Sequence, residues 1–210
     1  MRPFVEEIVN VKGYGHCGFR VVARHLRMDE EDHILVRQTP IQELRIHKSD
    51  YMLIYDTDER YNKILNGLHP QKCTSGIASI DKWLTPDMGH IIATCYNRAI
   101  VLLALPENGI CETYFPIRGA PPLKPHSNIM CLCLIPDHYL HVILMEGCLL
   151  PPSCMEWNNN KIGEAENWHF KFLDRQDAFN ELMSKEPKSP KKPTNEHNPI
   201  ICCDTPTPQK

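Results

Sequence analysis

The sequence predicts an α+β fold in which helices come first along the chain and strands follow. Helix-like amphipathic segments lie between residues 18 and 97, and four short apolar runs separated by Pro, Gly, Asn and Asp occupy residues 98–145. Helices that precede strands favour a small, mostly antiparallel sheet with the N-terminal helices packed against it. The 210 residues, 42% of them hydrophobic, suffice for one domain with a substantial core.

The first helices are indicated by an apolar stripe and by capping residues. In "GFRVVARHLRM" the apolar side chains at 19, 22, 23 and 26 share one helical face, and residues 29–38 predict a second helix. A new helix is predicted to begin here. Thr39 suits the N-cap, Pro40 the first helical position and Gln42 the third position after the cap. We therefore expect Pro40 to divide two helices.

Three later segments complete the helix predictions. "DERYNKILNGL", residues 58–68, is a short helix that closes near Gly67. "TPDMGHIIATCYN" has Thr85 as cap, Pro86 first and Asp87 near the positive helix end, and we expect its His90 to pack in the core. "RQDAFNELMSK" predicts a last helix.

The strand predictions rest on β-branched or apolar runs bounded by turn residues. They are "RAIVLLAL", "ETYFPIR", "IMCLCLI" and "YLHVILM", at 98–105, 112–118, 129–135 and 139–145. Trp83, Trp157 and Trp168 are predicted as core anchors.

The composition divides the chain into a domain, residues 1–183, and a tail, residues 184–210. The segment 187–210 holds six of the 18 prolines and no aromatic residue, so it cannot bury enough apolar surface to fold. Its "KSPKKP" is either a nuclear-localisation or docking patch or a solvated linker.

The net charge and the cysteines indicate which partners and which cellular compartment to expect. The net charge of −3 gives no basic field, so no nucleic-acid partner is expected. The longest apolar run, "AIVLLALP", is far shorter than the roughly 20 residues of a membrane span, and "MRPFVEEIVN" lacks the apolar core of a signal peptide. Ten irregularly spaced cysteines without a C-x-x-C pair predict free thiols in a reducing interior, cytoplasm or nucleus. No two of the possible ligands have the spacing of a zinc finger, so no metal site is predicted. This holds also for the thiols of "CLC" at 131–133 together with Cys148, Cys154 and His141.

The stretch "GYGHCGFR", residues 13–20, carries the strongest candidate for chemistry. Cys17 lies where a glycine loop gives way to a helix, whose free N–H groups lower the pKa of a thiol. Gly13 and Gly15 permit a tight loop that aims N–H groups inward, as an oxyanion hole requires. The residues alone leave two interpretations open: a nucleophile, or a buried structural thiol.

A cysteine nucleophile requires a general base, and the chain offers eleven histidines. His138 in "PDHYLHVILM" lies between two predicted strands, at a hairpin edge from which it can lean over a helix end. His141, three residues further along, faces the opposite side of a strand. Spacing by itself does not select His138.

Three separated segments resemble the ovarian-tumour (OTU) family of cysteine proteases. "GYGHCGFRVVARHL" is similar to the family's nucleophile segment, Asp-Gly-Asn/His-Cys. "WLTPDMGHIIATCYNRAIVLL" and "IPDHYLHVIL" resemble the following helix–strand segment and the segment with the catalytic histidine, and "LLPPSCMEW" resembles a later Pro-containing segment. The pieces occur in the family's order over about residues 5–175, and they most resemble OTU proteins related to transposable elements.

The resemblance implies a papain-like fold and a deubiquitinase that hydrolyses isopeptide bonds of ubiquitin or ubiquitin-like conjugates. Cys17 is the implied nucleophile and His138 the implied base. The loop residues Gly13, Tyr14, Gly15 and His16 are implied to shape the oxyanion site, with no metal and no cofactor. The implied partner is ubiquitin or a ubiquitin-like protein.

Two residues depart from the family pattern. Tyr14 replaces the aspartate three residues before the nucleophile, and Leu140 replaces the Asn or Asp two residues after the histidine. Asp137 is then the remaining candidate orienter, although a regular strand points it away from His138. Loss of an orienter favours a second interpretation, a catalytically impaired OTU-fold module that binds ubiquitin. A third is a mobile-element remnant without a selected activity.

Overall fold

A five-stranded mixed sheet forms the centre of the computed structural model, which describes residues 4–71, 77–105 and 107–185. The strand order is β1-β5-β4-β2-β3. Neighbouring strands are antiparallel except for β2 and β4, so the prediction of a mostly antiparallel sheet is confirmed. The strands are β1 (Val5–Val9), β2 (Ile100–Ala104), β3 (Glu112–Tyr114), β4 (Met130–Ile135) and β5 (His138–Leu144).

All four predicted strands are present, but β1 was not predicted. It is an edge strand of five residues whose central three are exposed, so it lacks the apolar run that marks a strand in the sequence. It pairs with β5, with Val9 opposite His141. This pairing places residue 10 beside the first residues of β5.

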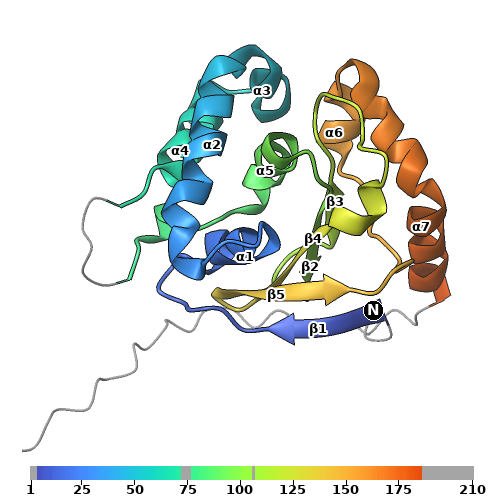
Figure 1. Cartoon of the computed structure of the whole chain (residues 1–210). Helices are drawn as coiled ribbons and strands as arrows, with labels where there is room; N and C mark the ends of the chain where they lie inside the picture. The colour runs from blue at the N-terminus through green and yellow to red at the C-terminus, as the bar shows by residue number, and fades with distance from the viewer. Residues whose placement is uncertain (1–3, 72–76, 106, 186–210) are drawn as a thin grey trace, which may run out of the picture.

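Helices α1 and α5 pack against the sheet, and the remaining helices surround them (Figure 1). Helices α2, α3 and α4 gather on one side of α5, and α6 and α7 lie on the other. The fold is therefore α+β, as the sequence predicted. The α-helices are α1 (Cys17–His25), α2 (His33–Ile46), α3 (Lys48–Tyr55), α4 (Asp58–Leu68), α5 (Gly89–Tyr96), α6 (Met155–Asn160) and α7 (Glu166–Lys185).

The prediction that Pro40 divides two helices is wrong, because α2 runs through it. A proline inside a helix leaves the carbonyl four residues earlier without its partner. That carbonyl belongs to Val36, and the hydroxyl of Tyr96 donates to it at 3.1 Å. A tertiary hydrogen bond from α5 thus replaces the missing helical one, and local sequence signals do not contain it.

The other helix predictions are confirmed with shifted boundaries. Thr57 caps α4, since its side chain accepts from the Arg60 N–H. Thr85 makes no side-chain cap, and Pro86–Met88 form a 3₁₀ turn (η4) before α5 begins. The predicted last helix is the second half of α7, which starts at Glu166. Helix α3 was not predicted.

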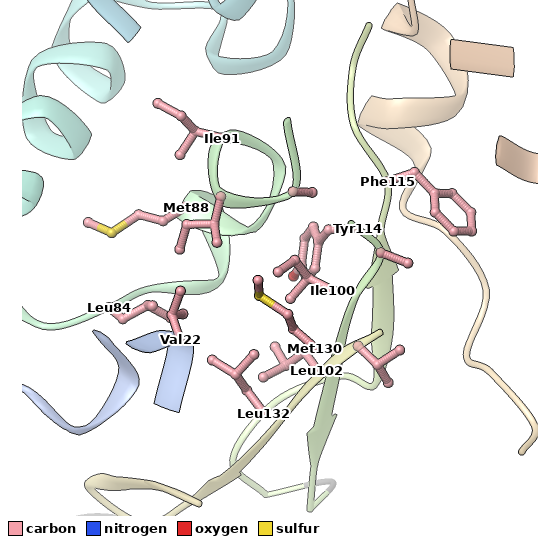
Figure 2. Close-up of a cluster of buried hydrophobic side chains, with 14 of the residues drawn as sticks. Val22, Leu84, Met88, Ile91, Ile100, Leu102, Tyr114, Phe115, Met130 and Leu132 are labelled. Atoms are coloured by element: carbon pink, nitrogen blue, oxygen red, sulfur yellow. The ribbon is translucent and has the colours of Figure 1, made fainter. Parts of the chain in front are cut away.

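Part of the core lies around α5 (Figure 2), where Ile100, Leu102, Met130 and Leu132 of the sheet gather. Met88 and Ile91 point away from these strands, and Met88 packs against Gly67 of α4. A second aromatic group joins Phe115 to α6 and α7 through Trp157, Trp168 and Phe172, with ring centroids 5.1–6.3 Å apart. Trp157 and Trp168 are fully buried core anchors, as predicted. Trp83 is not one: it is half-buried and lines a pocket.

The predicted boundary at residue 183 falls inside α7, which continues to Lys185. Residues 186–210, which contain most of the predicted tail, lie outside the described part of the chain. Within the described ranges, no helix combines the length and apolar character that crossing a bilayer requires.

Candidate functional site

Cys17 is the first residue of α1 and is 5% exposed. The first turn of α1 packs closely against Leu84 and Tyr139. A Cβ on Gly18 would lie 2.5 Å from the Cβ of Leu84 and 3.2 Å from the ring of Tyr139. Only a glycine permits this approach, so the absence of a side chain at residue 18 lets the Cys17 end of α1 lie against β5.

The loop before Cys17 has the tight geometry that its glycines predict. Tyr14 and Gly15 both adopt positive φ angles, 61° and 77°. A Cβ on Gly15 would collide with the indole of Trp83. The Tyr14 carbonyl accepts from the Ala78 N–H at 2.9 Å, while its phenol ring is 64% exposed. Tyr14 therefore contributes its backbone to the loop, and its side chain does not enter the site.

His16 points away from the thiol. Its ring stacks on His33 with centroids 4.3 Å apart, and its Nδ1 lies 3.3 Å from Nη2 of Arg37. Arg37 is fully buried, donates to the carbonyls of Gly67 and Lys82, and lies over the ring of Phe19. His16 thus helps to fix the loop to the helical layer. Of the four predicted loop residues, only Gly15 lines the pocket beside Cys17.

His138 is the first residue of β5 and pairs with Ile135 at the end of β4. Pro136 and Asp137 form the two-residue turn between these strands. Pro at the first turn position and a positive φ of 57° at Asp137 are the pattern of a type II turn. Asp137 is exposed at the turn, so the tight hairpin, rather than a long loop, determines where His138 lies.

The hydrogen-bond partner of His138 is Asn10, not Asp137. Nε2 of His138 lies 2.8 Å from Oδ1 of Asn10, which follows the last residue of β1. Extending the β1–β5 register by one residue puts Asn10 opposite Leu140. Side chains directly opposite one another on antiparallel strands share a face of the sheet. The residue after a neighbouring strand therefore supplies the amide that residue 140 lacks, and in the described part of the chain Asp137 makes no hydrogen bond to His138.

Cys17 and His138 line the same pocket, which has a volume of about 460 Å³. The residue after His138, Tyr139, lines the same pocket, and its backbone N–H opposes the rise in the Cys17 pKa. Trp83, Leu84 and Pro86 contribute to a mostly apolar wall, and the carboxylates of Glu107 and Asp137 lie at its edge. The pocket can therefore take an extended, partly apolar chain.

Burial raises the pKa of the Cys17 thiol above its ordinary value. Backbone N–H groups of Tyr139, Gly18 and Cys17 oppose this shift, as does the nearby Arg20, because they stabilise negative charge on sulfur. The sequence predicted a lowered pKa from the helix N-terminus alone. Helix α1 supplies the N–H groups of Cys17 and Gly18 and β5 supplies that of Tyr139, but desolvation outweighs them.

Two functional candidates were missed by the sequence analysis. Asn10 gave no signal, because β1 was not recognised and its register with β5 was unknown. Asn108 also lines the pocket, and its Nδ2 is shielded from water without a partner in the described part of the chain. An amide N–H₂ can donate two hydrogen bonds, and a shielded one without a partner is unsatisfied.

A cysteine–histidine contact lies in the core, away from Cys17. Nε2 of His90 is 2.9 Å from Sγ of Cys154, and its Nδ1 is 3.3 Å from the Phe115 carbonyl. Burial lowers the pKa of His90 to about 4 and raises that of Cys154 to about 12, so both groups are neutral. The adjoining cavity of about 100 Å³ is too small for a peptide. The expectation that His90 packs in the core is confirmed.

The seven cysteines of the described segments are free thiols. Within residues 4–71, 77–105 and 107–185, no three His, Cys, Asp or Glu side chains converge on a point that would hold a metal ion.

No protein-family model and no curated protein matches this chain. Solved structures with a similar fold include the viral OTU domain protease from Dera Ghazi Khan virus, at 17% identity over 69% of this chain and 83% of that chain, with a TM-score of 0.47. The OTU domain of OTUD1 is 16% identical over 65% and 84%, with a TM-score of 0.46. The Hazara virus OTU bound to ubiquitin is 13% identical over 66% and 81%, with a TM-score of 0.44. These likenesses are distant, and the functional argument comes from this chain's own residues.

The raised pKa of Cys17 predicts slow alkylation at neutral pH. Since the thiolate is the reactive form, a pKa raised by burial leaves only a small fraction of Cys17 reactive at pH 7. The rate with iodoacetamide, followed by mass spectrometry of the Cys17 peptide, should rise about tenfold per pH unit between about pH 6 and 9. A rate independent of pH over this range would mean that Cys17 is already ionised and would contradict the dominance of burial.

Proposed function

We propose that this protein is an OTU-like cysteine isopeptidase that acts on ubiquitin or ubiquitin-like conjugates, in a reducing compartment such as the cytoplasm or nucleus. The observation that carries the proposal is the arrangement of Cys17 and His138 in one pocket, with Asn10 hydrogen-bonded to the imidazole. The similarity of the motifs to OTU proteins related to transposable elements supports the same class.

The proposed reaction begins with proton transfer from the Cys17 thiol to His138. The sulfur then attacks the carbonyl carbon of the substrate's C-terminal glycine, and its oxygen becomes an oxyanion. The imidazolium protonates the lysine amine as the C–N bond breaks, which leaves a thioester on Cys17. Water deprotonated by His138 hydrolyses the thioester and regenerates the thiol. A neutral Cys17 thiol in the free protein is consistent with these reaction steps, because His138 removes the thiol proton when the substrate is attacked.

Asn10 is proposed to set the tautomer of the base. If its Oδ1 accepts from the Nε2–H of His138, the lone pair of the neutral ring is on Nδ1. The ring then presents an unprotonated nitrogen for the Cys17 proton. The backbone N–H of Cys17 is the proposed oxyanion donor.

The pocket favours a flexible peptide end over a compact side chain. Its apolar wall suits an extended segment, and the Glu107 and Asp137 carboxylates suit a basic residue within it. Gly15 lets the loop approach closely to Trp83, where a bulkier loop residue would collide. The wall and the carboxylates support a substrate with an extended end that carries a basic residue.

The direct test is labelling with ubiquitin that carries a C-terminal electrophile. Wild type should form a covalent adduct, and Cys17→Ala should form none, because the bond forms at Cys17. Cys154→Ser is a matched control, since that thiol also contacts a histidine but lies on a small cavity. His138→Gln should slow adduct formation at least about 100-fold, whereas His90→Gln should not, provided that it folds.

The outcomes separate the two main interpretations. Ubiquitin binding without an adduct would contradict the isopeptidase and support the catalytically impaired binding module. An adduct that survives Cys17→Ala would contradict the assignment of the nucleophile.

The role of Asn10 predicts a loss in kcat rather than in KM. Asn10→Ala should lower kcat roughly 10- to 100-fold with a model isopeptide substrate, because the neutral ring loses its preference for one tautomer. Asn10→Asp should restore much of the activity, since a carboxylate also accepts from Nε2–H. A loss through KM alone, or no rescue by Asp in a folded variant, would contradict a positioning role.

A further inference from the structure

A second and larger groove, with a volume of about 970 Å³, lies at the other end of α1 from Cys17. Its walls are the last turn of α1, residues 123–129 and the second half of β5. The distance from the first to the last residue of α1 is roughly 12 Å at 1.5 Å per residue, so the groove is separate from the Cys17 pocket.

The groove is strongly cationic in a chain whose net charge is −3. Four cationic side chains and a single carboxylate, Glu146, line it; the cations are Arg24, Arg27, Arg98 and Lys124. The carbonyl end of α1 adds a negative partial charge that favours cations at its last turn. The arrangement therefore concentrates positive charge around the last turn of α1.

Most of this charge is not neutralised within the described part of the chain. Arg24 pairs with Glu30 at 3.1 Å, whereas Arg27, Arg98 and Lys124 form no ion pair there. Arg98 is held in place because its Nη1 donates to the His25 carbonyl at 2.9 Å. Burial, and then repulsion from Arg27, lower the pKa of Arg98. Like charges held together without counter-charges favour binding of an anion.

Two histidines form the inner wall of the groove. The rings of His25 and His141 lie 4.1 Å apart, and His141 is 6% exposed. Nδ1 of His141 is shielded from water and has no hydrogen-bond partner in the described segments. Burial lowers the pKa of His25 to about 4 and also lowers that of His141, so both rings are neutral at pH 7. The charge of the groove therefore comes from its Arg and Lys side chains.

We propose that this groove binds a small ligand that carries two or more linked phosphate groups. Arg and Lys are the side chains suited to phosphate oxygens, and the volume is that of a small-molecule site. Phe, Tyr and Trp, on which the bases of a nucleic-acid strand commonly stack, are missing from its described lining. The proposal is independent of the activity proposed for Cys17.

Calorimetric titration of the full chain with inorganic tripolyphosphate, at about 150 mM salt, tests the site. The double variant Arg27→Gln, Lys124→Gln should bind at least about tenfold more weakly, because each side chain contributes a charged hydrogen bond. Both side chains are exposed, so we expect the variant to fold. Lys63→Gln removes an exposed positive charge on α4, away from the groove, and should bind like wild type.

Cys17→Ala should also bind tripolyphosphate like wild type, which separates this inference from the proposed isopeptidase. No measurable binding, equal binding by the double variant, or an equal loss in Lys63→Gln would overturn the proposal. A single-stranded oligonucleotide that binds the groove more tightly than tripolyphosphate would overturn the small-ligand assignment in favour of a nucleic acid.

Discussion

The close packing of the first turn of α1 against β5 is the constraint on which the candidate site depends. Residue 18 has no side chain, and Leu84 and Tyr139 occupy the space where one would be. This contact holds the Cys17 end of α1 against β5, so that Cys17 and His138 line one pocket. A larger residue at position 18 would separate the helix from the strand, and the two side chains, 121 positions apart in sequence, would no longer share a pocket.

The sheet contributes a second part of the site through strand pairing. A two-residue turn fixes where His138 enters β5, and the β1–β5 register brings Asn10 opposite Leu140. In the sequence, Leu140 takes the place of the Asn or Asp that would orient the histidine. In three dimensions the missing amide comes from the neighbouring strand, as a hydrogen bond to Nε2 of His138. Departure from a local motif therefore does not by itself imply loss of the interaction, because a cross-strand neighbour can occupy the same space.

The sequence could predict the elements whose signals are local. The order of helices and strands, the four apolar strands and the start of α1 at Cys17 all follow from periodicity and turn residues. It could not predict continuation of α2 through Pro40, which depends on the Tyr96 hydroxyl, nor strand β1, which exposes most of its residues. It also could not show that desolvation outweighs the helix N-terminus at Cys17. Each of these depends on contacts between segments far apart in the chain.

The central claim is that residues 17 and 138 lie together in solution, and chemical cross-linking tests it directly. A His138→Cys variant would be treated with a short bifunctional thiol reagent, and the cross-linked peptides would be identified by mass spectrometry. His126→Cys, in the distant groove, serves as the matched control. The account predicts a cross-link between the peptides of residues 17 and 138, absent when Cys17 is also replaced by Ala. Single-ended adducts alone, or equal cross-linking of Cys17 to residue 126, would contradict it.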